Sequence, residues 1–298
     1  MEITVKGYAK INLHLDVLGI RDDGYHSVQT VMQTLDLCDD VTVILTDSED
    51  IVIECNIDGV PTDEKNIAYK AARLFFDKLG RRSGAHIKIE KRIPMAAGMA
   101  GGSADAAATL VALNKLLSYP FDLDGLCTLG AMLGADVPFC IACGTKYSDG
   151  KGEILHDFPS LLDDIIFVAA CGGEGVSTPW AYRELDGEYN RFEDYTPHGT
   201  DDIKQTLIDG EKYDFCKYIF NIFEKPILAK RPVASDIKKT LLDNGALCAM
   251  MSGSGPSVFA VYEECGSALA AVDKLKQKGY FAAISKPISQ KNARYSDI

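Results

Sequence analysis

The sequence has no apolar run long enough to span a bilayer, and its first residues, Met-Glu-Ile-Thr-Val-Lys, lack the apolar core of a signal peptide. We therefore expect a cytoplasmic protein that does not insert into a membrane. Positive charge is also scarce: 31 Lys and Arg residues stand against 43 Asp and Glu residues, for a formal net charge of -12. This balance argues against a broad surface for nucleic acid or an anionic membrane, but it leaves room for a local basic pocket.

Two common nucleotide-binding motifs are missing as well. The chain has no G-x-x-x-x-G-K-[ST] loop of the Walker type and no G-x-G-x-x-G after a first strand. Its nine cysteines are scattered, and the only C-x-x-C, formed by Cys140 and Cys143, lacks the second ligand pair that zinc needs. We therefore expect reduced, packed thiols and predict no metal site built from protein ligands.

The most informative feature that is present is a glycine-rich stretch at residues 94–107, which runs into helix-forming residues at 103–117. Glycines let a backbone approach a ligand closely, and the first amides of a helix have no partners within it. Such amides favour an anion, above all a phosphate, and Ser103 would either cap the helix or contact a phosphate oxygen. Taken alone, a turn of this kind is more often a plain connector.

The apolar pattern predicts an intermixed set of strands and helices, which favours an α+β fold over a parallel doubly wound sheet. The length of 298 residues suggests roughly two domains, and a composition shift at 149–152 divides them into 1–152 and 153–298. A polar segment at 186–202 is either a lid or an idle insertion. Strands are expected at 3–17, 28–37, 40–45, 51–55, 85–91, 165–170, 247–251, 258–262 and 281–285, and helices at 66–79, 103–117, 123–133, 202–209, 212–222, 234–244 and 266–278.

Several polar residues allow both a structural and a functional reading. Lys10 and Asn12 share one face of the first strand, so either that face is solvated, as periodicity alone favours, or Lys10 has an anionic partner. Tyr25 and His26 follow a turn, and they either stack on a ligand base or are strand-edge aromatics. Asp136 follows a helix, where a turn or cap role is commoner than a place in a cleft. The glycine turn at 252–257 is likewise either a connector or a ligand site.

The order of five motifs carries a resemblance to a known family. The motifs resemble those of the GHMP kinases, which include galactokinase, homoserine kinase, mevalonate kinase and phosphomevalonate kinase, and the resemblance covers nearly the whole chain. The first, second and fourth resemble in particular the 4-diphosphocytidyl-2-C-methyl-D-erythritol kinases within that superfamily. The motifs are Ala9-Lys10-Ile11-Asn12-Leu13, Asp23-Gly24-Tyr25-His26, the stretch at 94–107, Gly134-Ala135-Asp136-Val137-Pro138-Phe139 and Met251-Ser252-Gly253-Ser254-Gly255-Pro256-Ser257-Val258-Phe259.

This resemblance implies a fold and an activity. The fold would be α+β, with an N-terminal domain of mixed sheet and helices, a C-terminal ferredoxin-like domain, and the active site in the cleft between them. The activity would be ATP-dependent phosphorylation of the 2-hydroxyl of 4-diphosphocytidyl-2-C-methyl-D-erythritol in the methylerythritol phosphate route to isoprenoid precursors. ATP and Mg²⁺ are the implied cofactors, with the ion held mostly by phosphates and water. The implied partner is this small molecule, with no nucleic acid and no membrane, and the oligomeric state stays open.

The resemblance also implies roles for individual residues. Asp136 would be the general base and Lys10 the lysine that accompanies it. Tyr25 and His26 would hold the cytosine, which Tyr182 would cover from the other side, while Asn12 would hold the methylerythritol and Gly253 and Ser254 would flank the site. The ATP site would comprise Pro94, Met95, Ala96, Ala97, Gly98, Met99, Ala100, Gly101, Gly102, Ser103 and Ala104, with Asn66 and Lys91 beside the adenosine.

The glycine stretch departs from the family pattern in two places. Met99 and Ala100 replace the commoner Leu-Gly, and Ala104 replaces a second serine. Two other readings are a homoserine- or mevalonate-type kinase and a non-catalytic nucleotide-binding module. The Asp-Gly-Tyr-His motif argues against the first, and the presence of both Lys10 and Asp136 argues against the second.

Overall fold

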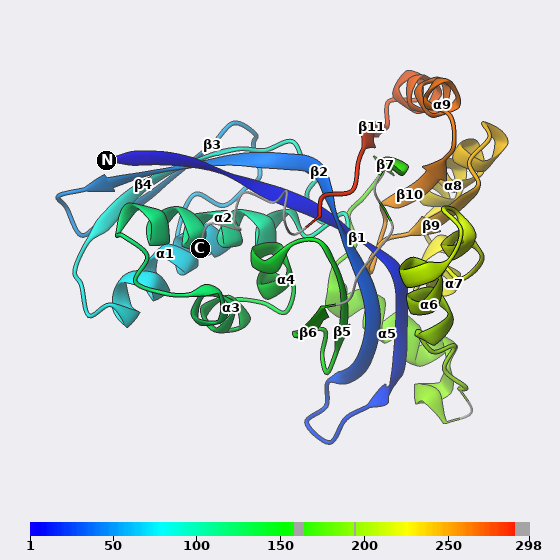
Figure 1. The fold of residues 1–298 in the computed structure, drawn as a ribbon, viewed down its shortest axis with the longest axis horizontal. Coiled ribbons are helices and arrows are strands. Elements are labelled where there is room, and N and C mark those ends of the chain that lie inside the picture. The colour runs from blue at the N-terminus through cyan, green and yellow to red at the C-terminus, as the bar shows by residue number, and fades with distance from the viewer. Residues whose placement is uncertain (158–161, 163, 194, 290–298) are drawn as a thin grey trace.

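The computed structural model describes residues 1–157, 162, 164–193 and 195–289, which form two sheets with helices packed around them (Figure 1). The larger sheet has seven strands, with the path β3-β4-β2-β1-β8 and with β5 and β6 branching from β2. The smaller sheet has four strands in the order β11-β7-β10-β9. The expected α+β class is confirmed.

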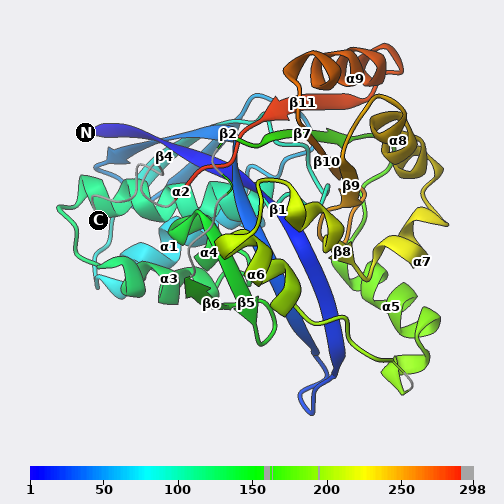
Figure 2. The same ribbon diagram turned by 45° about the vertical axis from the view of Figure 1, so that its right-hand side comes forward.

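A long antiparallel hairpin, β1 (Glu2–Ile20) and β2 (His26–Thr46), forms the centre of the larger sheet and extends beyond it (Figures 1 and 2). We expected two strands where β2 is continuous, and that prediction was wrong. Cys38 and Asp39 keep their pairing with Tyr8 and Gly7 of β1. The acidic residue does not interrupt the strand because its buried carboxylate accepts hydrogen bonds from the backbone amides that follow β4.

The remaining elements of the first half surround the buried helix α2 (Gly101–Leu116), whose residues from Ala104 to Asn114 are all buried. A helix that is apolar on every side is expected in a core. The surrounding elements are β3 (Ile51–Cys55), α1 (Ile67–Lys78), β4 (Gly84–Glu90), α3 (Leu123–Ala131), α4 (Val137–Ala142), β5 (Thr145–Asp149) and β6 (Ile154–Asp157).

The smaller sheet has a ferredoxin-like arrangement. Its elements follow the chain order β7 (Ile166–Cys171), α8 (Pro232–Asp243), β9 (Cys248–Met251), β10 (Val258–Tyr262), α9 (Cys265–Gln277) and β11 (Phe281–Ser285), and all its neighbouring strands are antiparallel. Figure 2 shows α8 and α9 beside this sheet. The expected ferredoxin-like C-terminal unit is therefore confirmed.

Both faces of the smaller sheet are buried, which explains the unbroken apolar run of β10. Phe259 and Val261 belong to the same hydrophobic core as α2, whereas Val258, Ala260 and Tyr262 pack in the core beneath α8 and α9. Alternate residues of a strand face opposite sides, so a strand between two cores is apolar throughout. The two halves of the chain thus share one core.

Between β7 and α8 the chain differs most from expectation. It contains α5 (Thr178–Glu188), η1 (Asn190–Phe192), α6 (Asp201–Asp209), η2 (Asp214–Lys217), β8 (Phe220–Asn221) and α7 (Glu224–Leu228). The helix expected at 212–222 was wrong, because β8 instead pairs in parallel with His14 and Leu15 of β1. The pattern did not reveal α4, α5, α7 or the β5–β6 hairpin.

Two further expectations concern the chain as a whole. The domain boundary near residues 149–152 stays a prediction. These residues lie at the end of β5 and in the turn before β6, and both strands pair within the larger sheet. Within the ranges given above, the protein has no helix that combines the length and the apolar character needed to cross a membrane.

Candidate active site

Lys10 of β1 and Asp136, just before α4, lie side by side although 126 positions apart in the sequence. The Lys10 Nζ is 3.7 Å from Asp136 Oδ2 and donates a hydrogen bond of 2.7 Å to Asn12 Oδ1. Asn12 is held in turn by Thr30, whose hydroxyl accepts from its amide nitrogen at 2.8 Å. The predicted meeting of the lysine, the asparagine and the aspartate therefore exists.

This arrangement corrects two readings of the sequence. The face of β1 that carries Lys10 is not solvated: the side chain is only 5% exposed, and its anionic neighbour is Asp136. Asp136 occupies the N-cap position of α4, but its side chain makes no capping hydrogen bond. Its carboxylate is 40% exposed, so it is free to meet a ligand. A cap role cannot explain a carboxylate placed against a buried ammonium.

The glycine-rich loop rests directly on the second glycine turn. Ser252 joins the two, because its hydroxyl donates to Gly98 O at 3.1 Å and accepts from Asn12 N at 3.2 Å. Lys10 N donates to Met99 O at 3.2 Å. A Cβ on Gly98 would lie 2.2 Å from Ser252 O, so only glycine permits this approach. The 252–257 turn is therefore both the β9–β10 connector and one support of the loop.

The start of α2 has the free backbone donors that an anion site requires. The helix begins at Gly101 with Ala100 as its N-cap, so Ser103 lies inside the first turn and its predicted capping role was wrong. Among the described residues, the backbone amides of Gly101, Gly102 and Ser103 have no hydrogen-bond partner. These donors, aligned with the helix dipole, are suited to bind a phosphate.

This helix start lies next to the segment that carries Asp136. A Cβ on Gly102 would lie 3.5 Å from Ile67 Cγ2, and one on Gly134 would lie 3.9 Å from Ile67 Cδ1. Ile67 at the beginning of α1 therefore touches both the phosphate-binding helix start and the loop leading to the carboxylate. The start of α2 and the segment that carries the candidate base are therefore neighbours in the fold.

Ahead of Gly98 the loop is fastened to the second half of the chain. Ala96 O accepts from Val176 N at 3.2 Å, and Ala97 O accepts from Ser257 N at 3.1 Å. The loop is thus shaped by contacts that lie far away in the sequence.

Two residues expected near the adenosine have their side chains engaged inside the protein. Asn66 caps α1 by accepting from Ala68 N at 2.8 Å, and it donates to Pro61 O at 2.7 Å. Lys91 Nζ donates to Asp39 Oδ2 at 2.5 Å and to Asp105 Oδ2 at 2.8 Å, and all three groups are buried. Both side chains therefore make hydrogen bonds that support the fold.

The Asp39–Lys91–Asp105 cluster holds the chain that enters the glycine loop against the first turns of α2. Burial raises the pKa of Asp105 to about 7, against the pull of the Lys91 ammonium, and the nearby Asp39 adds to the rise. Asp105 Oδ1 has no hydrogen-bond partner in the described part of the chain. Sequence reasoning missed this cluster because Asp39 and Asp105 read as a strand break and an ordinary helix residue.

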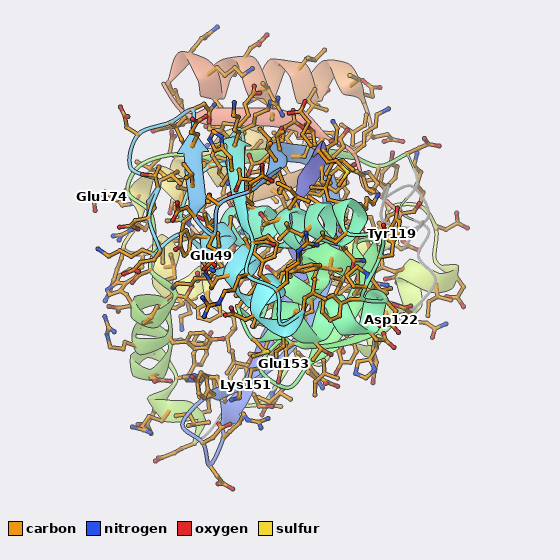
Figure 3. The ribbon with its side chains drawn as sticks, turned by 90° about the vertical axis from the view of Figure 1, so that its left-hand side faces the viewer. Glu49, Tyr119, Asp122, Lys151, Glu153 and Glu174 are labelled. Atoms are coloured by element: carbon orange, nitrogen blue, oxygen red, sulfur yellow. The ribbon has the colours of Figure 1, made fainter. Side chains whose placement is uncertain are left out.

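The residues expected around the cytosine fall into two sets. His26 stacks on Tyr182 with ring centroids 4.3 Å apart, and burial, with Asp136 and Asp186 nearby, raises the pKa of the Tyr182 hydroxyl. Tyr25 is 61% exposed, and Lys151 Nζ lies 3.8 Å from its ring centroid. Figure 3 labels Lys151 beside the end of the β1–β2 hairpin.

The polar segment near residue 190 packs on the same strand as Lys10. Asp16 is fully buried and accepts from the Tyr195 hydroxyl at 2.6 Å and from His198 N at 2.7 Å. Phe192 is also buried, with its ring 5.8 Å from that of His26. Its described residues therefore pack beside His26 and against β1.

Two hollows elsewhere on the protein do not include the Lys10–Asp136 pair. One lies between α1 and the end of α3, around Tyr69 and Met132. The other lies between α3, α4 and the β5–β6 hairpin, around Thr128 and Pro138. The candidate active site lies instead where the two halves of the chain meet, at the contact between the glycine loop and the 252–257 turn.

Comparisons with known proteins identify the family of this chain. The family model for the GHMP kinases N terminal domain matches residues 66–144, and that for the GHMP kinases C terminal matches residues 207–280. A 4-diphosphocytidyl-2-C-methyl-D-erythritol kinase of Acetivibrio thermocellus is 42% identical over 287 residues, covering 96% of this chain and 99% of the relative. The chain belongs to this kinase family. A second member, from Lachnoclostridium phytofermentans, is 42% identical over 88% of both chains.

Solved GHMP kinases share the fold. A crystal structure of 4-(cytidine 5'-diphospho)-2C-methyl-D-erythritol kinase superposes with a TM-score of 0.77 at 30% identity, covering 95% of this chain and 99% of that one. The homoserine kinase of Cytophaga hutchinsonii gives 0.73 at 21% identity, over 97% and 95% of the two chains, which speaks for the fold alone. GHMP kinases are ATP-dependent small-molecule kinases, and this member carries the same two-domain frame.

Proposed function

We propose that this chain transfers the γ-phosphoryl group of ATP to the 2-hydroxyl of 4-diphosphocytidyl-2-C-methyl-D-erythritol, a step on the methylerythritol phosphate route to isoprenoid precursors. One observation carries the proposal: the Lys10–Asp136 pair lies beside the glycine loop, to which Lys10 N donates at Met99 O, and this loop leads into the amides at the start of α2, which are unpartnered among the described residues. The names of relatives that match nearly the whole chain supply the substrate.

In this proposal the α2 amides bind the phosphates, and the Lys10–Asp136 pair acts on the acceptor hydroxyl. The amides of Gly101, Gly102 and Ser103 hold phosphate oxygens, which positions the triphosphate and stabilises its charge. Asp136 accepts the proton of the 2-hydroxyl as that oxygen attacks the γ-phosphorus. Lys10, anchored by Asn12, remains beside the carboxylate and offsets the negative charge of the transferring group.

Mg²⁺ is the metal we expect with ATP, and the residues present fit that assignment. No group of three or more His, Cys, Asp or Glu side chains suited to a metal occurs in the described ranges, while the Asp136 carboxylate is 40% exposed. The ion would therefore take most of its ligands from phosphate oxygens and water. When bound, it neutralises negative charge on the phosphates.

The base end of the substrate would lie near the tip of the β1–β2 hairpin. We assign the cytosine to the surface formed by Tyr25, His26 and Tyr182, where rings offer stacking and the imidazole offers a hydrogen bond. Gly253 and Ser254 would border the sugar side of the site, with the Ser254 hydroxyl 3.5 Å from that of Thr178.

Measuring ADP release with different acceptors tests this function. We expect ADP release to require the cytidine substrate and to stay at the background rate with homoserine or mevalonate. Turnover of either of those acceptors at a higher rate would point to another GHMP kinase. ATP binding without acceptor-dependent ADP release would identify a non-catalytic nucleotide-binding module.

A further inference from the structure

His26 is held from three sides in the structure. It begins β2 and pairs with Ile20 of β1, so its backbone is fixed by the hairpin. Its ring stacks on Tyr182 at 4.3 Å and meets the edge of Phe192 at 5.8 Å. Its Nε2 lies 2.7 Å from Asp186 Oδ1. The second ring nitrogen, Nδ1, takes no part in these contacts.

Asp186 is well placed to act on this ring. It follows Tyr182 by four residues on α5, so both side chains lie on the same face of the helix. Its side chain is 30% exposed and that of His26 is 12% exposed, so water screens the contact only in part. One helix face thus provides both the ring under His26 and the carboxylate at its edge.

The contact has a chemical consequence for the imidazole. An ionised carboxylate can only accept hydrogen bonds, so Nε2 must carry the proton and donate it to Asp186. In a neutral imidazole the other nitrogen is then a lone-pair acceptor. Within the described residues, Nδ1 has no hydrogen-bond partner of its own. It is therefore available to a donor on a ligand.

We propose that Asp186 is a positioning residue that makes the site select cytosine over uracil, by fixing His26 with its proton on Nε2. This inference rests on the proposed function and assigns the base preference of that same site. The exocyclic amine of cytosine donates to an acceptor such as Nδ1. Uracil carries a carbonyl oxygen at the same ring position, which would face the Nδ1 lone pair without a shared proton.

The test compares kcat/KM for the cytidine substrate with that for its uridine analogue. In Asp186→Leu the Nε2 proton loses its acceptor, and the imidazole is free to carry its proton on Nδ1 instead. We expect the cytidine preference to fall on the order of tenfold, through KM and not kcat, because one hydrogen bond is affected. Asp186→Asn keeps an acceptor oxygen and should retain most of the preference.

Glu188→Gln is the matched control, because Glu188 lies on the same helix but pairs with Lys225 at 2.5 Å. It should leave the preference unchanged. Imidazole ¹⁵N chemical shifts give a readout that needs no substrate: in the wild type, Nε2 should be the protonated nitrogen. A His26 protonated on Nδ1, or an unchanged base preference in Asp186→Leu, would overturn the inference. Failure of the proposed function would look different, since the wild type would then turn over neither nucleotide substrate.

Discussion

Lys10 shows most clearly how a single residue reveals function. A buried ammonium is costly unless it is paired, and its partners here are an asparagine and a carboxylate that is 40% exposed. A pair built for stability would bury both members, as Lys91 and Asp39 do. Lys10 and Asp136 instead form a pair that is closed on one side and open on the other, as a reaction with an incoming molecule requires.

At the residue scale, the sequence predicted the site from motifs better than from periodicity. The alternation of β1 correctly placed Lys10 and Asn12 on one face, but it could not show that β8 pairs along the edge of β1 or that the 252–257 turn bonds to the Asn12 backbone. Asp186 and Lys151 were missed because each matters through a partner distant in sequence. The local signals were that Asp186 follows Tyr182 by four residues and that Lys151 lies within the turn at 149–152.

Replacing Asp136 tests the catalytic assignment. Asp136→Asn keeps the size of the side chain but removes the base, so kcat should fall more than about a hundredfold. ATP affinity should change little, because the α2 amides are untouched. Asp124→Asn, an exposed substitution on α3, is the control and should keep full activity. An Asp136→Asn enzyme within a few-fold of wild type would remove Asp136 from the role of base.

Ala100 carries backbone strain at the start of α2, the helix that we propose binds phosphate. Its φ of 57° and ψ of 28° lie in the left-handed region, which costs a residue with a Cβ roughly 1–2 kcal/mol. Ala100→Gly removes that strain. It also raises the conformational entropy of the unfolded chain, which lowers the unfolding free energy by about 0.4–1 kcal/mol. The net expectation is a stabilisation of roughly 0.5–1 kcal/mol, measured by urea unfolding.

Ala131→Gly supplies the contrast for this substitution. Ala131 is an exposed α3 residue of ordinary helical conformation, where glycine should destabilise by about 0.5–1 kcal/mol. Opposite signs for the two substitutions would establish that Ala100 is strained. A loss of stability in both would show that it is not.

At the scale of elements, local pattern was reliable where an element buries one regular face. The bounds of α1, β3, β10 and β11 differ from expectation by two residues at most at either end. It failed for β8 and α7, which are short and are fixed by contacts with β1 and β9 rather than by their own periodicity. It also failed for α5, which packs against η1 and α7. The β2 strand was divided because acidic residues usually end strands, whereas Asp39 is neutralised inside the core by Lys91.

The contact between the two glycine turns gives a prediction at this scale. Gly98→Ala would place a methyl group 2.2 Å from Ser252 O at a φ of +79°, so both strain and overlap oppose it. We expect a loss of more than about 2 kcal/mol in unfolding free energy and a marked rise in the KM for ATP.

Gly80→Ala isolates the overlap from the strain. Gly80 has a φ of +60°, but a methyl group on it would meet no described atom within 4 Å, so only the strain, about 1–2 kcal/mol, should appear. Its KM for ATP should equal that of the wild type. Equal losses of stability in the two variants would mean that the Gly98–Ser252 approach is not tight in solution.

At the scale of the whole molecule, the two halves of the chain are bound together at the site and in the core. The glycine loop receives hydrogen bonds from Val176, Ser252 and Ser257, and the main core contains residues of both sheets. The order of the motifs predicted the two-part fold, but no local pattern could show that one half shapes the loop of the other. That information lies in long-range packing.

The buried Asp39–Lys91–Asp105 cluster should make stability depend on pH. Because folding raises the pKa of Asp105 from its usual 3.8 to about 7, the native state holds a proton that the unfolded chain has released. The stabilisation of the native state by this proton is complete below about pH 4 and is lost as the pH rises through about 7.

The prediction is measured as unfolding free energy in urea at several pH values. Between about pH 5 and pH 8 the wild type should lose about 2 kcal/mol more than Asp105→Asn, which cannot ionise. Parallel curves for the two proteins would show that Asp105 does not hold this proton.

The Gly98–Ser252 contact has a consequence for folding during translation. A nascent chain whose Ser252 still lies inside the ribosomal tunnel has already exposed Gly98, yet it lacks the surface on which that glycine rests. The glycine loop therefore gains this support only after residue 252 has left the tunnel, long after the loop itself has emerged.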